Sequence, residues 1–309
     1  MTPLSSEETA ALLPYPELVA AIAHAAQELA SGAVNAPERL AVPMGAANTL
    51  LCMPAVAPDL TAIKIVTVHT NNAAHSLPAI QGEVIVLDTA TGRRLMLLDG
   101  PTVTARRTAA VTLLAIKTLS PREPRSALII GTGAQAATHA DALINYFGMR
   151  SLWIAGEELP LAQTFCDKLR SAHAGIDAVP VKASTLAPTG ADTDVVIALT
   201  TAKAPVIPPQ LPDATLAIGV GAFRPDMAEL PAALLGKRRI VVDYLKGARH
   251  EAGDLLQAGV DWTTVTELSA HLGPDVSSRD HTPTAFKSVG HASWDLAAAR
   301  VALQRCGRR

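Results

Sequence analysis

Apolar residues recur at helical spacing near the start of the chain. Between residues 16 and 32 they lie three or four positions apart, at Leu18, Ile22, Ala25 and Leu29. This period places them on one face of a helix, which Gly32 would end. Just upstream, Ser5 and Glu8 have the spacing of a capping box, in which each side chain accepts from the other residue's backbone N–H. The pattern predicts that the chain opens with a helix.

Short β-rich runs follow, among them 62–68 (AIKIVTV) and 83–100 (EVIVLDTATGRRLMLLDG). In the second run, Thr-Ala-Thr-Gly separates two strand-like segments as a hairpin turn would. A helical pattern covers 102–119, and the next segment, 120–126 (SPREPRS), has two prolines and clustered charges that break regular structure. We therefore predict an α+β sheet domain over residues 1–121 and a domain junction after it.

The second part of the chain alternates apolar strand candidates with helical stretches. The candidates are 126–131 (SALIIG), 151–156 (SLWIAG), 194–200 (DVVIALT), 215–221 (TLAIGVG) and 238–245 (RRIVVDYL). Continuous apolar strands with helices between them are typical of a parallel sheet covered by helices on both faces. We predict an α/β fold with a doubly wound sheet of the Rossmann type over residues 122–290.

A glycine-rich turn follows the first of these strand candidates. Gly131, Gly133 and Ala136 fit G-x-G-x-x-A, whose positions serve a tight turn, close approach of the backbone to a pyrophosphate, and close helix–strand packing. The backbone N–H groups and the positive end of the helix dipole there suit a phosphate. We predict that a dinucleotide binds at Gly131, Thr132, Gly133, Ala134 and Gln135.

Composition excludes several other classes of protein. With 309 residues and 49% apolar content the chain can bury a large core, while a net charge of −2 provides no basic field for nucleic acid. Residues 1–10 lack the pattern of a signal peptide, and no apolar run approaches the ~20 residues of a membrane span, so we expect a cytoplasmic protein without membrane contact. The three cysteines are scattered and no His pair has metal-ligand spacing on a convincing helix, so we expect neither disulfides nor a metal site.

Four segments occur in the order and approximate spacing of one known family: 99–110 (DGPTVTARRTAA), 129–136 (IIGTGAQA), 219–230 (GVGAFRPDMAEL) and 284–290 (TAFKSVG). The chain resembles the ornithine cyclodeaminase and mu-crystallin family, and the third segment is more similar to its mu-crystallin, or ketimine reductase, branch. The resemblance implies a substrate-binding and dimerisation domain made of 1–121 and 291–309, with the Rossmann domain inserted between them. It also implies a homodimer whose subunits join through their sheets.

Three basic residues match the family's substrate-binding positions: Arg39, Lys64 and Arg107. Reduction of a C=N bond beside a carboxylate needs a clamp for that carboxylate and a donor or positive charge near the nitrogen. Lys64 interrupts an apolar strand, where a lysine must extend its ammonium group to solvent or pair with an anion. The alternative is that the strand lies at the edge of the sheet and that Lys64 faces solvent. Arg106 points about 100° from Arg107 on a helix, and the resemblance selects Arg107. We expect Lys64 and Arg107 to be catalytic.

The resemblance implies further cofactor contacts at Thr200, Val220, Lys287 and Ser288. Glu157 and Glu158 directly follow the second strand candidate, at the point of a Rossmann domain where an acidic side chain accepts from ribose hydroxyls and repels a 2′-phosphate. Unlike NADP-preferring relatives, the segment offers no Arg or Lys. We predict that NADH is preferred over NADPH and that Glu157 is the contact. The alternative is that both glutamates form the solvated first turn of a helix.

We predict an NAD(P)H-dependent reductase of a small ketimine, of the pyrroline- or piperideine-2-carboxylate type, that yields an L-amino or imino acid. An ornithine cyclodeaminase, an alanine-type amino-acid dehydrogenase and a non-catalytic small-ligand binding protein are the alternatives. The family's cyclodeaminases carry an aspartate where this chain has Phe223, and a phenylalanine cannot accept a hydrogen bond from the substrate amine. We therefore predict that the protein is not an ornithine cyclodeaminase. The alternative is that Asp226 serves in place of that aspartate.

Three further polar residues are weighed between structural and chemical roles. His291 follows the TAFKSVG segment, and we favour packing or surface exposure over catalysis there. Glu251 and Asp254 are expected to begin a helix rather than to act as a catalytic pair, because carboxylates stabilise the first turn.

Overall fold

The computed structural model describes residues 2–45, 48–69, 71–186, 193–273 and 280–307, and the chain divides into two compact units. Unit 1 comprises Met1–Ala110 and His291–Arg309, and unit 2 comprises Val111–Gly290. The division falls inside helix α3 (Gly100–Leu119), whereas the sequence predicts the junction after residue 121. The predicted segment 120–126 begins where α3 ends. The predicted domain bounds stay a proposal.

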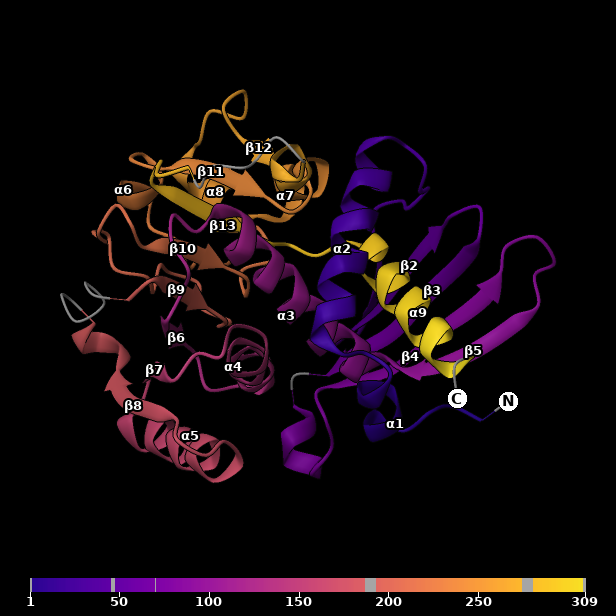
Figure 1. The fold of residues 1–309 in the computed structure, drawn as a ribbon, viewed down its shortest axis with the longest axis horizontal. Helices are drawn as coiled ribbons and strands as arrows, with labels where there is room; N and C mark the ends of the chain where they lie inside the picture. Colours follow the sequence, from indigo (N-terminus) through magenta and orange to yellow (C-terminus); the bar gives the residue numbers. More distant parts are fainter. Residues whose placement is uncertain (1, 46–47, 70, 187–192, 274–279, 308–309) are drawn as a thin grey trace. The chain divides into compact units, whose positions relative to one another are not determined.

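Unit 1 contains a five-stranded sheet in which neighbours along the chain pair antiparallel (Figure 1). Its strands are β1 (Leu40–Met44), β2 (Asn48–Val56), β3 (Leu60–His69), β4 (Ile80–Asp88) and β5 (Arg94–Asp99). The predicted hairpin is confirmed, because β4 pairs with β5 and the Thr91 N–H donates to the Asp88 side chain in the turn. The short 3₁₀ helix η1 (Asn72–His75) precedes β4.

Helices α1 (Ser6–Ala11), α2 (Tyr15–Ala30) and α9 (Ala292–Cys306) lie wholly in this unit, and the first half of α3 also belongs to it. The predicted capping box is present at the start of α1, where the Glu8 N–H donates to Ser5 Oγ and the Ser5 N–H donates to the Glu8 carboxylate. Leu18 and Ile22 of α2 are buried, as their spacing predicts. Helix α9 packs against both α2 and β3 (Figure 1). The last helix therefore joins the N-terminal helix and sheet in one core.

Side chains alternate between the two faces of this sheet. Along β3, Leu60, Ala62, Lys64 and Val66 are buried, whereas Ile65 between the last two is exposed. Because strand side chains alternate with period two, the buried set faces the α9 side and Ile65 faces the opposite side. Lys64 therefore lies in the core, on the face of the strand where the alternating pattern predicts apolar residues.

Unit 2 is built on an eight-stranded sheet in which all pairs are parallel, in the order β12-β11-β13-β10-β9-β6-β7-β8. The strands are β6 (Ser126–Ile130), β7 (Ser151–Gly156), β8 (Asp177–Lys182), β9 (Val195–Ala198), β10 (Leu216–Gly219), β11 (Arg239–Val242), β12 (Thr266–Glu267) and β13 (Thr284–Lys287). All five predicted strands are confirmed. The order reverses at β6, which lies between β7 and β9, and α/β folds bind ligands beyond the carboxyl ends of strands at such a point.

Helices connect these strands. They are α4 (Ala134–Phe147), α5 (Leu159–Ala172), α6 (Ala232–Leu235), α7 (Leu245–Glu251) and α8 (Gly253–Ala258), with the 3₁₀ helices η2 (Ala183–Thr185) and η4 (Leu268–His271). Asp254 lies in the first turn of α8 as predicted, but the expectation for Glu251 is wrong, because this residue ends α7. Within the described residues, none of the helices has both the length and the apolar character needed to cross a membrane.

Candidate active site

A buried ion cluster lies inside unit 1. Lys64 Nζ on β3 is 2.8 Å from Asp295 Oδ2 in the first turn of α9, and Arg107 Nε on α3 donates to Asp295 Oδ1 at 3.2 Å. All three side chains are buried, with Lys64 2% exposed. Of the two possibilities for a lysine in this apolar strand, the structure shows that it finds an anion. The alternative, a solvent-exposed lysine on an edge strand, is wrong, because Lys64 is buried and β3 lies between β2 and β4.

The cluster carries more positive than negative charge. Two cations share the single Asp295 carboxylate, and Arg39 is close enough to affect the pKa of Lys64. Burial lowers the pKa of Lys64 to about 8, Asp295 opposes this, and the positive charges of Arg107 and Arg39 reinforce it. An excess of buried positive charge suits a small anion, and a lysine with a pKa near 8 suits proton donation near neutral pH.

Arg106 and Arg107 have different surroundings, as their angular separation predicts. Arg106 Nε donates to the carbonyl of Leu13 at 2.8 Å, and its guanidinium lies 4.2 Å from the centroid of the Tyr15 ring. These contacts attach α3 to the segment before α2. Arg106 is therefore a packing arginine, whereas Arg107 points to the carboxylate of Asp295.

Asp295 is the member of the cluster that the sequence analysis missed. It lies in ASWDLAAAR, where it reads as an ordinary acidic residue in the first turn of a helix. The signal in the sequence is the apolar, alanine-rich run around Asp295, which is typical of a buried helix. A charged residue on a buried helix needs a partner of opposite sign. Lys64, a charged residue in an apolar strand, needs such a partner for the same reason.

His291 is the N-cap residue of α9. Its Nδ1 accepts from the Ser293 N–H, lies 3.1 Å from Ser293 Oγ, and the imidazole packs edge-on against Trp294 with 6.1 Å between ring centroids. The side chain is 5% exposed. These contacts support the packing role that the sequence analysis favours.

The glycine turn of unit 2 connects β6 to α4. Gly131 has φ +123°, and a Cβ there would lie 2.7 Å from the carbonyl oxygen of Leu199 on the neighbouring loop. At Gly133, the N-cap of α4, a Cβ would meet open space, and no side chain caps this 14-residue helix. Its first N–H groups are thus left for another acceptor, and the exposed turn leaves room for it. These features fit the phosphates of a dinucleotide.

The neighbouring strand ends present the other predicted cofactor residues. Glu157 is exposed immediately after β7, and Glu158 is the N-cap of α5 without a side-chain capping bond. Thr200 follows the end of β9 and Val220 follows β10 directly. Each of these strands ends at the same edge of the parallel sheet as β6, which is where the sequence analysis expects the cofactor.

Lys287 and Ser288, which are predicted to contact the cofactor, are both buried. Lys287 Nζ is 2.7 Å from Asp254 Oδ2 and 3.9 Å from Glu229 Oε2, and all three side chains are buried. Ser288 Oγ donates to Asp243 Oδ2 at 2.8 Å. Their polar atoms are engaged within unit 2, and their contact with a cofactor stays a prediction. No sequence pattern marks Glu229 or Asp243 as a functional residue.

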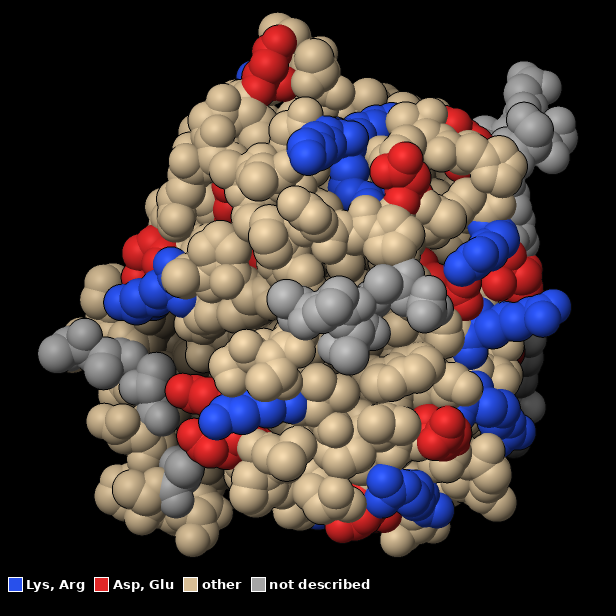
Figure 2. Space-filling view, turned by 90° about the vertical axis from the view of Figure 1, so that its left-hand side faces the viewer, with Lys and Arg blue, Asp and Glu red and all other residues tan. Residues whose placement is uncertain are grey.

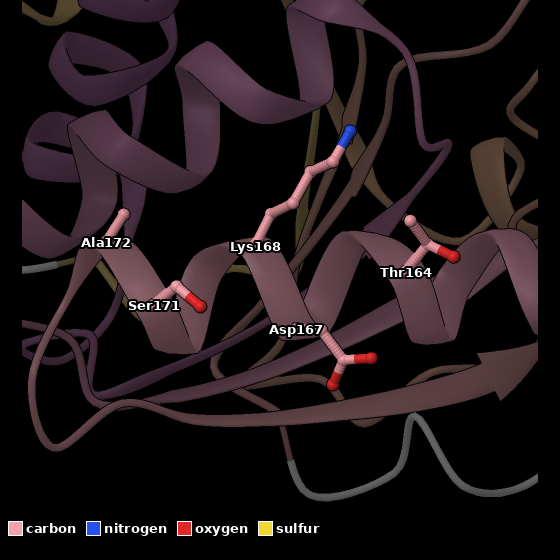
Figure 3. A pocket seen from close by; sticks show the side chains of 5 residues that line it. All are labelled: Thr164, Asp167, Lys168, Ser171 and Ala172. Atoms are coloured by element: carbon pink, nitrogen blue, oxygen red, sulfur yellow. The ribbon is translucent and has the colours of Figure 1, made fainter.

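The described surface also has a depression outside the predicted sites. A shallow depression on α5 is lined by Thr164, Asp167, Lys168, Ser171 and Ala172 (Figure 3), none of which is a predicted site residue. On the face that Figure 2 shows, basic and acidic side chains are interspersed rather than gathered by sign. Among the described residues, no group of three or more His, Cys, Asp or Glu side chains is arranged to hold a metal ion.

Comparison with known proteins covers nearly the whole chain. The ornithine cyclodeaminase/mu-crystallin family profile matches residues 4–308. Delta(1)-pyrroline-2-carboxylate reductase 2 of Burkholderia ambifaria is 45% identical over 96% of this chain and 93% of that protein. Ketimine reductase mu-crystallin of Rattus norvegicus is 32% identical over 93% of this chain and 90% of that protein.

A solved structure has the same fold along its full length. Thermococcus litoralis Delta(1)-pyrroline-2-carboxylate reductase, in complex with NADH and L-proline, superposes with a TM-score of 0.88 at 26% identity and covers 100% of this chain and 98% of that one. The profile match and the identity to the curated reductases agree with the four segments that first suggested a resemblance. The chain belongs to the ornithine cyclodeaminase/mu-crystallin family.

Proposed function

We propose that this protein is an NAD(H)-dependent reductase of a cyclic ketimine carboxylate, of the pyrroline-2-carboxylate or piperideine-2-carboxylate type, and that it yields the cyclic L-amino acid. The observation that carries the proposal is the buried cluster of Lys64, Arg107 and Asp295, whose charge suits a small anion. The names of the 45% identical reductases and the NADH and L-proline in the Thermococcus structure support this substrate class.

The residues of the chain have distinct roles in this reaction. Arg107 and Arg39 bind the substrate carboxylate, since guanidinium groups suit carboxylates, and Lys64 donates a proton to the imine nitrogen. NADH, when bound, supplies the hydride that reduces the imine carbon. One hydride and one proton convert the C=N bond into CH–NH, and Lys64 regains its proton from solvent. Asp295 keeps the Lys64 ammonium in place without binding the substrate.

The alternative functions predict different products. A panel of cyclic imine carboxylates, pyruvate with ammonium, and L-ornithine is assayed with purified protein, following nicotinamide absorbance and, for ornithine, the proline formed. We expect turnover of the cyclic imines and no proline from ornithine. Phe223 offers no acceptor, and Asp226 is paired with Arg224 at 3.0 Å and Lys203 at 3.5 Å. Binding of the imines without turnover would favour the non-catalytic alternative.

The reaction should lose rate in alkaline solution. Because the pKa of Lys64 is lowered to about 8, its donating form dominates below that pH and disappears above it. We expect kcat/KM for the imine to fall about tenfold per pH unit above pH 8. The titration of the free imine, measured without protein, is divided out of the profile. An identical alkaline limb in the residual activity of Lys64→Met would assign the titration to another group.

We propose that NADH is preferred over NADPH and that Glu157 is the selecting residue. Glu157 is exposed directly after β7, next to the strand that leads into the glycine turn. Replacing Glu157 by Ala should reduce the ratio of kcat/KM for NADH over NADPH by about tenfold, the effect of one charge-assisted hydrogen bond. Glu158→Ala is the matched control and should leave the ratio unchanged. Equal use of the two cofactors by the wild type would contradict the preference.

We also propose that two copies associate through the outer face of the five-stranded sheet. Large apolar side chains are exposed on this face at Leu40, Val42, Met44 and Ile65, and the strand register places Leu40, Cys52 and Ile65 in one row across three strands. An exposed apolar face of this kind marks an association surface. A cytoplasmic location remains a prediction from the sequence.

The double substitution Val42→Lys/Ile65→Lys should convert a dimer to a monomer in solution, because each lysine would have to be desolvated in the interface. The mass is measured by light scattering after size-exclusion chromatography. Leu161→Lys, at a 56% exposed position on α5, is the control and should leave the mass unchanged. A wild-type monomer would contradict the proposal.

A further inference from the structure

One buried carboxylate connects the loops that follow the neighbouring strands β9 and β10. Glu229 Oε1 accepts from the Thr200 N–H at 2.7 Å and the Thr200 hydroxyl at 2.9 Å. Glu229 Oε2 accepts from the Gly221 N–H at 2.7 Å and the Ala222 N–H at 3.1 Å. The side chain is completely buried. Both oxygens are therefore used to hold two loops to each other.

Glu229 is itself held by a second carboxylate and a buried lysine. Asp254 Oδ1 accepts from the backbone N–H groups of Glu229 and Leu230, and Asp254 Oδ2 pairs with Lys287 Nζ at 2.7 Å. The same ammonium lies 3.9 Å from Glu229 Oε2. A buried carboxylate is tolerated when its oxygens are fully hydrogen-bonded and a cation is near, and such a network is rigid.

The two loops are packed against each other and against the glycine turn. A Cβ at Gly221 would lie 2.0 Å from the carbonyl oxygen of Thr200, so a larger residue would separate the loops. A Cβ at Gly131 would lie 2.7 Å from the carbonyl oxygen of Leu199 and 3.6 Å from Thr200 Cγ2. The position of the loop around Thr200 therefore limits the position of the turn that carries Gly131.

We propose that Glu229 is a positioning residue for the dinucleotide: it acts through Thr200 and the backbone of Gly221 and Ala222, and it holds the carboxyl ends of β9 and β10 in register with the glycine turn. The Thr200 hydroxyl donates its hydrogen to Glu229 and accepts from the Ala202 N–H at 3.2 Å. Thr200 consequently offers a ligand its methyl group and a remaining acceptor site, not a donor. The inference rests on the proposed function, because it presumes that the glycine turn holds NAD(H).

Replacement of Glu229 by Gln separates this role from general stability. The amide oxygen still accepts from one loop, but the NH₂ group faces the N–H donors of the other, which lose their acceptor. We expect the Kd for NADH, measured by fluorescence without imine, and the KM for NADH to rise about tenfold to a hundredfold. The KM for the imine and kcat at saturation should stay near wild-type values. Asp226→Asn, in the same segment but exposed, is the matched control and should change none of these.

A second pair of variants tests the same link if Glu229→Gln fails to fold. Thr200→Val removes the hydroxyl donor to Glu229 and should raise the Kd for NADH, whereas Thr200→Ser keeps the hydroxyl and should restore most of the affinity. A folded Glu229→Gln protein with the wild-type Kd, or one in which only the melting temperature changes, would overturn this inference alone. Wild-type protein that binds no NADH would overturn the proposed function as well.

Discussion

Replacing Lys64 by Met is expected to lower kcat/KM for the cyclic imine by roughly 30- to 1000-fold, equivalent to about 2 to 4 kcal/mol of transition-state stabilisation. The methionine is similar in length but carries no charge and no proton. The substitution removes the proton donor and one positive charge facing the substrate anion. Asp295 keeps Arg107 as a partner at 3.2 Å, so the carboxylate is not left without a cation. Steady-state kinetics with saturating NADH measure the effect.

Arg107→Met should cause a loss of similar size, because the guanidinium is the proposed clamp for the carboxylate. Arg106→Met is its control, since Arg106 packs on Tyr15 and Leu13 and should affect stability more than turnover. For Lys64→Met the control is Lys203→Met, at a side chain that is 74% exposed. Near-normal turnover by either the Lys64 or the Arg107 variant would remove that residue from the site.

Replacing Asp295 by Asn should reduce the free energy of unfolding at neutral pH by about 3 to 5 kcal/mol, the typical cost of breaking a buried ion pair from one side. The amide has the same shape but cannot balance the charges of Lys64 and Arg107, both of which are buried. Urea unfolding followed by circular dichroism measures the loss. Asp59→Asn is the matched control, because Asp59 pairs with Arg300 at 2.6 Å but is 58% exposed, and exposed pairs contribute at most about 1 kcal/mol.

The destabilisation by Asp295→Asn should become smaller as the pH rises toward 8. Without the carboxylate, nothing opposes the effect of burial and of the neighbouring arginines, so the pKa of Lys64 should fall further below its usual value. Above that pKa the buried lysine is neutral and its desolvation costs less, while the unfolded chain still binds the proton. Stability of the variant therefore rises with pH from this lower pKa, whereas stability of the wild type rises only above about pH 8, so the difference between them narrows up to about pH 8 and is constant above it. A loss that is independent of pH would show that packing, not charge, is responsible.

Local signals in the sequence predicted the elements they belong to. The Ser5 and Glu8 capping box, the hairpin between β4 and β5, and the glycine turn each depend on residues a few positions apart, so the required groups are all visible in one short segment. Strand β8 was missed because Pro180 and its charged ends obscure the apolar pattern. Strand β13 has only four residues, too few to show a period, so the sequence indicates this segment only through its resemblance to the family.

The carboxylates were missed for a different reason. Asp295 and Lys64 are 231 positions apart by their numbers, and Glu229 meets Thr200 and Lys287 from segments with unrelated patterns. A charged residue in the sequence has the same appearance whether it faces water or a buried partner. Lys64 was recognisable as unusual because it interrupts an apolar strand, but nothing in its surroundings identifies the partner on α9.

The sequence by itself determined the α/β class, the glycine turn and the basic residues of the proposed substrate site, because hydrophobic period, turn chemistry and family segments are local properties of the chain. Only the tertiary structure decided which charges are paired. It brings Asp295 of the last helix to Lys64 and Arg107, and it places Glu229 between two strand ends. The physical reason is that a buried charge is stable only with a partner, and the partner is chosen by how distant segments pack.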